Sequence, residues 1–528
     1  MATTTAPGMV IPTGDEAAEP PAREEKTRLE RFLNTIERVG NKVPHPAVIF
    51  VLLIAFVVVL SHVFYALGAS VTYEAIDPET HAVSMTTTYA QSLLTADGIR
   101  FMYENVVQNF MNFNAVGVII VAMLGVGVAD ASGLITALIK KLVHIAPRKA
   151  LTYILVFVGI LSSIAADAGY LVLIPLGAAA FLSIGRHPLA GLAASFAGVA
   201  AVFTVNILIK PLDGILTGIT NDAIHLINPQ GSIDLTANFW FSVASVIVLT
   251  LVVSIVTERI VEPRLGTYVG ETPALESQGM TAAESRGLKL AGLATLAVLA
   301  VFALLSIPDG APLRNPETGT LIGDSPLMTG LIVLVTFIFL AAGLGYGLGA
   351  KTITSITDVT GAMEKAVSGL GGLIFLLFVI SQFLAFFTYS NLATLAAVEM
   401  GDFLADAGLG ALPLLLGFVL VVAVLDLIMT GAIPKWAIFA PVFVPLLMRL
   451  GVEPEAVLAA YRVGDGPLNA VSPLNAYFAL IVTFSAKYQK DAGVGTLVAL
   501  MLPYVVVVTV AWMILLALWQ VLGLPWGL

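Results

Sequence analysis

The stretch WAIFAPVFVPLLMRLGVEPEAVLAAYRVGDGPLNAVSPL, residues 436–474, decides the fold because the chain carries its pattern twice. A shift of 266 positions aligns it without a gap on YLVLIPLGAAAFLSIGRHPLAGLAASFAGVAAVFTVNIL, residues 170–208. Matches among alanine and leucine mean little in so apolar a chain. Glycine and proline coincide four times in this register: Pro175 with Pro441, Gly185 with Gly451, Pro188 with Pro454, and Gly198 with Gly464. We therefore predict an internal repeat.

The loops around the two copies carry opposite charges. Basic residues flank the first copy, namely Lys140, Lys141, Arg148, Lys149 and Arg186. The loops around the second copy, EMGDFLADAGLGA and RLGVEPE, are mainly acidic. Because basic loops stay on the cytoplasmic side of a membrane, the copies are predicted to enter from opposite faces. Inverted repeats whose broken helices meet at the midplane are the common plan of secondary transporters.

The composition places this repeat in a membrane. Of 528 residues, 58% are hydrophobic and 11% are charged, and the mean hydropathy is +0.95. Apolar windows recur along the chain, each near the roughly 20 residues that a helix needs to cross the hydrocarbon, so we predict helices and not a barrel. The net charge of −10 lies mostly in the N-terminal tail and loops, and no basic stripe suggests nucleic acid. The absence of cysteine excludes disulfides and thiolate metal sites.

Loop charges give the predicted topology. Lysines and arginines before the first span place the N-terminus in the cytoplasm, and the 69–100 loop, nearly free of them, lies outside. Residues 150–184 start and end near basic loops and contain the polar run SSIAADAGY, which predicts a re-entrant hairpin with Asp167 at its tip. Two closely packed full spans are the alternative. The prediction is an all-α membrane protein with nine transmembrane helices plus two re-entrant helical hairpins, its C-terminus outside.

This plan divides the chain into six predicted parts. They are a cytoplasmic tail with an interfacial helix (1–44), first spans and external loop (45–149), first repeat core (150–222), linking spans (223–367), second repeat core (368–490) and last span (491–528).

Arg462 and Asp465 are charged residues in a segment hydrophobic enough to cross a membrane. They are three positions apart, so they project from one helix turn and could pair. Gly464, Gly466 and Pro467 break the helix there and free backbone groups that can bind an ion or an anionic substrate. Charges in the membrane are costly and usually functional. A structural ion pair that locks two helices together is the alternative.

Other polar residues stand in apolar surroundings. Asp426, in LDLIMTGAIPKWAIFAP, is the best candidate for a proton carrier, because a desolvated carboxyl group readily takes up a proton. Trp436 could stack on an aromatic substrate, although a packing tryptophan fits equally well. Asp213 is predicted to be the counterpart, in the first copy, of the carboxylates in the second copy. Alternatively, it neutralises the charge of Lys210. Asn391, where a span ends, is a weaker signal. No Walker motif is present, so the energy source is predicted to be an ion gradient.

Five stretches form a familiar series: FLNTIERVGNKVPHP, DAGYLVLIPLGAAAF, GRHPLAG, PKWAIFAPVFVPLLM and AYRVGDGPLNAVSPL. In order and spacing they resemble the AbgT family, the p-aminobenzoyl-glutamate transporters, from about Phe32 to the C-terminus. The resemblance implies a homodimer of nine-span subunits with two hairpins. It also implies transport of p-aminobenzoyl-glutamate and related folate-pathway compounds, with proton-driven export of sulfonamide antimetabolites in some members.

The resemblance also implies roles for particular residues. The family's functional positions fall on Asp213, Trp436, Pro454, Arg462, Asp465 and Pro473, and its sodium site would involve Asp465 and Asn469. Two departures stand out. Asp426 takes the place of the family's usual asparagine, which adds a carboxylate. Ile433 and Pro434 replace the start of a Ser-Ala-Lys-Trp run, which removes a hydroxyl.

Three functional hypotheses result. The first is an inner-membrane carrier, multi-pass and not an enzyme, that uses the proton gradient to export aromatic carboxylates and sulfonamides. In it Arg462 attracts the anion and Trp436 faces the ring, and ions couple through Asp167, Asp213, Asn391, Asp426, Asp465 and Asn469. The second is a sodium-coupled importer of p-aminobenzoyl-glutamate or dicarboxylates. The third is an intramembrane hydrolase with an aspartate pair, against which the repeat argues. No cofactor is predicted, and a sodium ion is the one possible bound ion.

Overall fold

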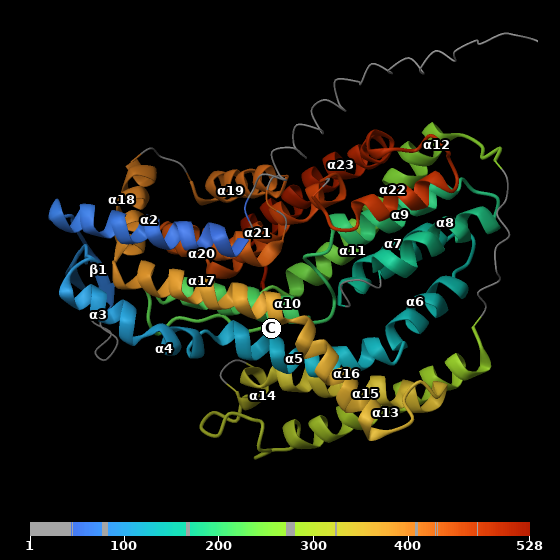
Figure 1. The fold of residues 1–528 in the computed structure, drawn as a ribbon, viewed down its shortest axis with the longest axis horizontal. Coiled ribbons are helices and arrows are strands. Elements are labelled where there is room, and N and C mark those ends of the chain that lie inside the picture. Colours follow the sequence, from blue (N-terminus) through green and yellow to red (C-terminus); the bar gives the residue numbers. More distant parts are fainter. Residues whose placement is uncertain are drawn as a thin grey trace, which may run out of the picture.

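The computed structural model describes residues 44, 46–76, 83–164, 169–270, 280–322, 325–406, 410–427, 429, 431–472 and 474–528. The predicted interfacial helix of the N-terminal tail, Asp167 and Pro473 lie outside the described residues. Helices dominate the described part of the chain, as predicted (Figure 1).

Seven helices in the described residues are long and apolar enough to cross a membrane. They are α2 (Pro46–Ala66), α11 (Phe239–Val256) continued by η4 (Thr257–Val261) and α12 (Glu262–Leu265), α13 (Ala282–Ser306), α15 (Leu331–Ala350), α17 (Gly371–Tyr389), α20 (Ala432–Arg449) and α23 (Val494–Val521). An eighth crossing results if α5 (Asn114–Ala131) and α6 (Leu134–His144), which meet at a 60° bend, are one span. The chain is therefore a multi-pass helical membrane protein. The count of nine spans plus two hairpins stays a prediction.

Short apolar helices make up the rest of both predicted repeat cores. The first contains α7 (Leu151–Leu161), η1 (Ser162–Ile164), η2 (Gly169–Leu173), α8 (Ile174–Ser183), α9 (Pro188–Phe196), η3 (Ala197–Ala201) and α10 (Pro211–Ile224). The second contains α19 (Ala411–Asp426), α20, α21 (Pro454–Asp465), η5 (Pro467–Ala470) and α22 (Phe478–Ala486). Both α9 and α21 begin with a proline at the first helical position, where its missing N–H costs nothing.

The backbone follows the same course at equivalent positions of the two cores. The turns before α9 and α21 contain Gly185 and Gly451, whose φ angles are 79° and 78°, a region that glycine enters without steric cost. A Cβ atom on Gly198 would lie 2.8 Å from the carbonyl oxygen of Val156 in α7, and one on Gly464 would lie 2.7 Å from that of Val419 in α19. In each core, glycine therefore lets the broken helix pack closely against the first helix of that core's hairpin, α7 or α19.

The two turns lie at opposite ends of one long helical segment. Arg186, in the turn before α9, donates from Nε to Glu262 (2.9 Å) at the C-terminal end of the segment that begins with α11. Asn238, just before α11, donates from Nδ2 to the carbonyl oxygen of Glu455 (2.8 Å) in the first turn of α21. The segment of 27 residues is about 40 Å long at 1.5 Å per residue, enough to cross the membrane.

Burial separates an inner group of helices from an outer one. Every residue of α9 is buried, and so is every residue of α21 from Ala456 to Asp465, whereas α13 buries only Gly287, Leu288, Ala291 and Ser306. A helix that is apolar and mostly exposed is suited to face lipid. Figure 1 shows α13 and α15 lying side by side along the lower edge, away from the broken helices.

The remaining elements lie between the spans. They are the antiparallel strands β1 (Ser70–Ile76) and β2 (Val83–Tyr89), α3 (Ala96–Glu104), α4 (Val106–Met111), α14 (Pro326–Thr329), α16 (Ile356–Gly369) and α18 (Leu392–Asp406). The hairpin of β1 and β2 adds a small sheet to the predicted helical fold, within the stretch that we expected to be an external loop. Val71 of β1 and Ala90 after β2 pack against Leu395 and Val398 of α18, which anchors the base of the hairpin.

Candidate functional site

The two broken helices touch where their regular hydrogen bonding stops. Thr204, after η3, donates from Oγ1 to the carbonyl oxygen of Arg462 (2.9 Å), and Arg462 Nη1 donates to the carbonyl oxygen of Thr204 (2.7 Å). A Cβ atom on Gly466 would lie 2.7 Å from the carbonyl oxygen of Ala201. These contacts satisfy backbone groups that a broken helix leaves open.

Arg462 forms an ion pair with Asp213 across the two cores. Its Nη1 lies 2.7 Å from Oδ1 of Asp213, and its Nε donates to Oδ1 of Asn238 (3.1 Å). Asp213 stands in the first turn of α10 and also accepts the backbone N–H of Lys210 (2.8 Å). The expected pairing of Arg462 with Asp465 is therefore wrong. Partners on facing elements bind these two side chains, although they share a helix turn.

A second group of buried charges surrounds Lys435, in the first turn of α20. Its Nζ contacts Oδ1 of Asp426, the last residue of α19, and Oδ1 of Asp465, the last residue of α21. All three side chains are at most 1% exposed. Within the described residues, Oδ2 of Asp426 and Oδ2 of Asp465 have no hydrogen-bond partner. One ammonium group thus joins two carboxylates that come from the ends of two helices.

Trp436 lies next to this group and is fully buried. Its indole N–H donates to Thr220 Oγ1 (3.0 Å) and to the carbonyl oxygen of Leu216 (3.2 Å), and its ring lies 4.6 Å from that of Tyr461, centroid to centroid. In this conformation Trp436 therefore joins α20 to α10 and α21 as a packing residue. Its predicted contact with substrate stays a prediction.

Two other predicted residues lie apart from the buried charges. Pro454 is the first residue of α21, at the turn that faces the start of α11. Asn391, between α17 and α18, donates from Nδ2 to the carbonyl oxygen of Tyr89 (3.0 Å) and so holds the end of β2. The predicted contact of Pro454 with substrate and the predicted role of Asn391 in ion coupling stay predictions.

The sodium site implied by the family resemblance does not fit the residues as they are placed. Asp465 turns its carboxylate to Lys435, while Asn469 in η5 directs its amide nitrogen to the carbonyl oxygens of Asp465 and Gly466. Asn469 lines the cavity described next, whereas Asp465 is fully buried. An ammonium group therefore contacts the carboxylate that was expected to bind sodium.

A cavity of about 800 Å³ opens among α5, α10, α16 and the interrupted parts of both cores. Small-molecule sites commonly measure roughly 300–1,000 Å³. Tyr170 and Tyr477, one from each core, line it and stack with ring centroids 4.3 Å apart. Lys210 lines it too, and its Nζ donates to Ser163 Oγ (3.2 Å) and to the carbonyl oxygen of Phe203. The cavity thus offers aromatic faces, the lysines Lys210 and Lys365, the carboxylate of Asp130 and the amide of Asn469.

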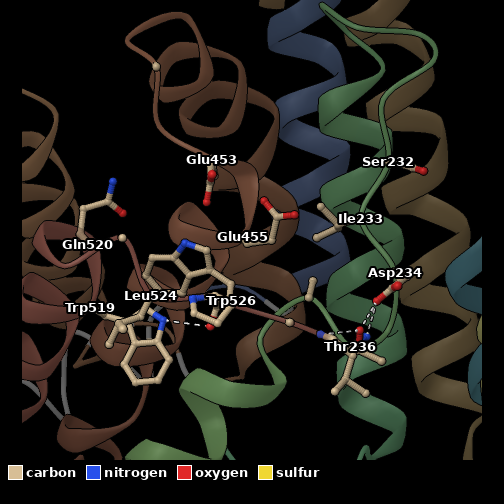
Figure 2. A pocket seen from close by; sticks show the side chains of 16 residues that line it. Ser232, Ile233, Asp234, Thr236, Glu453, Glu455, Trp519, Gln520, Leu524 and Trp526 are labelled. Atoms are coloured by element: carbon tan, nitrogen blue, oxygen red, sulfur yellow. Dashed lines mark hydrogen bonds between the residues drawn. The ribbon is translucent and has the colours of Figure 1, made fainter. Parts of the chain in front are cut away.

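A smaller cavity of about 450 Å³ lies near the start of α11, beside the C-terminal segment. Figure 2 shows Asp234, Glu453 and Glu455 around it, with Trp519 and Trp526 on the other side. Burial raises the pKa of the Glu455 carboxyl, and the charges of Glu453 and Asp234 raise it further. This acidic cleft is separate from the buried ion pairs and from the larger cavity.

Buried ion pairs, interrupted helices and a substrate-sized cavity in a multi-pass helical protein define a membrane transporter. The chain belongs to the AbgT putative transporter family, which residues 31–528 match. It is a transporter and not an enzyme, so the hydrolase hypothesis is set aside.

Named relatives cover almost the whole chain. The p-aminobenzoyl-glutamate transport protein of Escherichia coli (strain K12) is 34% identical over 493 residues, 93% of this chain and 95% of that protein. The Alcanivorax borkumensis YdaH transporter is 40% identical, with a TM-score of 0.86 over 92% of this chain and 100% of its own. MtrF of Neisseria gonorrhoeae, described as one of a class of antimetabolite efflux pumps, is 40% identical, with a TM-score of 0.88 over 93% and 97% of the chains.

Sequence reasoning did not single out some residues that the structure brings together. Lys435 was not selected as a site residue, yet it contacts two of the predicted ion-coupling carboxylates. Tyr170 and Tyr477 were not selected as site residues, although both lie where a helix is interrupted. A signal existed for Lys435 and Lys210, because each is a lysine in an otherwise apolar segment.

Proposed function

We propose that this chain is an ion-coupled secondary transporter of p-aminobenzoyl-glutamate-like aromatic carboxylates and sulfonamide-type antimetabolites, exported at the expense of the proton gradient. The observation that carries the proposal is the cavity of about 800 Å³ with Lys210 and the Tyr170 and Tyr477 pair in its wall. An aryl ring can stack on tyrosine, and an ammonium group attracts a carboxylate. The relatives named for p-aminobenzoyl-glutamate transport and antimetabolite efflux support the same substrates.

We further propose that the two cores are inverted repeats that exchange access to this cavity between the two faces of the membrane. Three pairs of residues 266 positions apart both line the cavity: Phe203 with Asn469, Lys210 with Ala476, and Pro211 with Tyr477. The hydrogen bonds of Arg186 and Asn238 at opposite ends of the α11 segment support the inversion. The six parts predicted from the sequence, with cores at 150–222 and 368–490, are retained on this basis.

The buried charges receive distinct roles in this proposal. The ion pair of Arg462 and Asp213 ties the two cores together, so substrate or ion binding that weakens it would let them move apart. Asp426 and Asp465 belong to the coupling machinery, because intramembrane carboxylates are costly unless they serve function. Trp436, Pro454 and Pro473 are retained as substrate-site candidates, with Asp167, Asn391 and Asn469 as candidates for ion coupling.

Transport by the purified protein in liposomes tests the function. Radiolabelled p-aminobenzoyl-glutamate or a sulfonamide is followed under a proton gradient and, separately, under a sodium gradient. We expect flux that the proton gradient drives and that Asp465→Ala abolishes. Flux that follows only the sodium gradient would favour the alternative, a sodium-coupled importer of p-aminobenzoyl-glutamate or dicarboxylates. No flux of either compound under either gradient would refute the substrate assignment.

A lysine pair tests whether the cavity is the substrate site. Lys210→Met removes the ammonium group from the wall, and Lys289→Met removes an exposed lysine of α13 as a matched control. A hydrogen bond to a charged group contributes about 1.5–3 kcal/mol, so we expect K210M to weaken substrate binding roughly 10- to 100-fold. Scintillation proximity binding measures this. Equal affinities in both variants would exclude Lys210 from the site.

We also propose a homodimer in the inner membrane with a cytoplasmic N-terminus. The family resemblance supports the homodimer and the inner membrane, and the loop charges support the cytoplasmic N-terminus. Mass measurement of the detergent-solubilised protein distinguishes a dimer from a monomer.

A further inference from the structure

Lys435 stands where a mobile cation would be expected. Its ammonium group lies between the carboxylates of Asp426 and Asp465, and none of the three side chains is more than 1% exposed. Two buried carboxylates side by side repel each other and lose their hydration, so a cation between them is needed to keep both ionised. A soluble sodium ion would serve equally well, because carboxylate oxygens suit hard cations.

We propose that the ammonium group of Lys435 is the built-in cation of this carrier, and that it excludes sodium from the position between Asp426 and Asp465. The lysine is covalently tethered beside the two carboxylates, so its effective concentration there far exceeds that of a dissolved ion. The ammonium group also carries three donors for carboxylate oxygens. The inference deepens the proposed function. Its coupling role rests on that function, whereas the position of the ammonium group between the two carboxylates rests on contacts between side chains alone.

The geometry of the two ion pairs strengthens this assignment. Asp426 and Asp465 each place a carboxylate oxygen against the ammonium group, so Lys435 is bound from both sides and not from one. The three residues also close three helix ends, those of α19, α20 and α21. A movement of the α19 and α20 hairpin away from α21 that exceeds the reach of the lysine side chain separates the ammonium group from Asp465. Lys435 is thus a positioning residue that couples hairpin movement to charge.

The test is sodium binding by the purified chain, which needs no transported substrate. Binding of radioactive sodium is measured in sodium-free choline buffer, together with the midpoint of thermal unfolding as sodium is added. The wild type and Lys435→Arg, which both keep a cation, are expected to show no saturable binding and no sodium-dependent stabilisation. Lys435→Met leaves two carboxylates without a cation, and we expect it to bind sodium and to be stabilised by it, because a ligand of the folded state raises stability.

Further variants define the site. Asp426→Asn combined with K435M leaves one carboxylate, and we expect sodium affinity to fall at least about tenfold from that of K435M. Lys210→Met removes another buried lysine and is expected to create no sodium site. Folded K435M that binds no sodium would overturn the proposal. Saturable sodium binding by the wild type that Asp465→Asn removes would also overturn it. If K435M fails to fold even in sodium, sodium binding is compared in the wild type and Asp426→Asn. Sodium binding by either protein would contradict the proposal, and the absence of sodium binding by both would support it.

These outcomes are separate from those of the liposome experiment. Sodium binding created by K435M supports the inference whether or not p-aminobenzoyl-glutamate is carried. Conversely, flux driven by protons would support the proposed function even if the position between the two carboxylates never bound sodium.

Discussion

Glu455 is a carboxylate whose surroundings disfavour its charge. It lies in the first turn of α21, where burial raises its pKa most; a backbone hydrogen bond opposes this rise, and the charges of Glu453 and Asp234 add to it. A carboxyl group with a raised folded-state pKa stabilises the fold fully below its unfolded value, about 4.3, and loses that contribution as the pH rises through the folded value. Glutamine lacks the charge at every pH. We therefore expect Glu455→Gln to unfold at a higher temperature than the wild type at neutral pH.

The difference should shrink as the pH falls toward 4.3, because the wild-type carboxyl then becomes neutral as well. Thermal unfolding of both proteins across this pH range measures it. Glu317→Gln, at an exposed position of the segment that follows α13, is the control and should leave the unfolding temperature unchanged at each pH. An unfolding temperature for E455Q below that of the wild type at neutral pH would show that the helix N-terminus outweighs burial at this site.

Single residues also mark what could be predicted of the site. Local sequence identified Asp213, Arg462, Asp426 and Asp465 as charges of functional interest, because a charged residue within an apolar segment can be recognised from local composition alone. Their partners depend on tertiary contacts. Asp213 is 249 positions from Arg462, a pairing that no local pattern of one sequence contains.

At the scale of elements, Gly464 permits the closest contact between α21 and α19. A Cβ atom there would lie 2.7 Å from the carbonyl oxygen of Val419 and 2.7 Å from Cβ of Val422. Backbone cannot move aside cheaply, and overpacking a well-packed site costs about 1–3 kcal/mol. We expect Gly464→Ala to lower stability by that amount and to reduce transport, since α21 carries Arg462 and Asp465. Thermal unfolding of the purified protein measures the first effect.

Gly417 provides the matched control in the same pair of helices. It lies on the exposed side of α19 with no atom within 4 Å of its Cβ position, so Gly417→Ala should stabilise the helix by up to about 1 kcal/mol. Gly198→Ala should behave like G464A, because the equivalent position in the first core meets Val156 at 2.8 Å. A tolerated G464A beside a costly G198A would argue that the two cores do not pack alike.

Local sequence predicted some interruptions of the helices correctly but missed one bend and two strands. Glycine and proline foretold the interruptions around α9 and α21, because these residues act locally on the backbone. The 60° bend between α5 and α6 was not foreseen: Gly133 with φ +85° permits it, but a single glycine in an apolar run rarely breaks a span. The strands β1 and β2 were missed because only loop charge was considered there, although SVTYEAI and VSMTTTY are rich in β-branched residues.

At the scale of the molecule, ion pairs and hydrogen bonds join distant segments at each end of the helices. Lys140 lies 3.4 Å from Glu284, which brings the end of α6 to the start of α13, and Arg186 brings the turn before α9 to Glu262. These contacts join segments that the positive-inside rule assigns to the cytoplasm. On the other face, the backbone N–H of Trp240 donates to the carbonyl oxygen of Trp526 (3.0 Å), which joins the start of α11 to the C-terminal segment.

The side of the membrane on which each face lies can be tested directly, because the chain contains no cysteine and needs no prior substitutions. We expect Lys149→Cys, in the basic loop after α6, to react with an impermeant maleimide only after the cells are opened, since basic loops remain cytoplasmic. Glu317→Cys, beyond the far end of α13, should react in intact spheroplasts. The cysteine-free parent sets the background, and transport by both variants verifies that they are folded. Labelling of both cysteines from one side would mean that the chain crosses the membrane an even number of times between residues 149 and 317, and the reverse pattern would place the N-terminus outside.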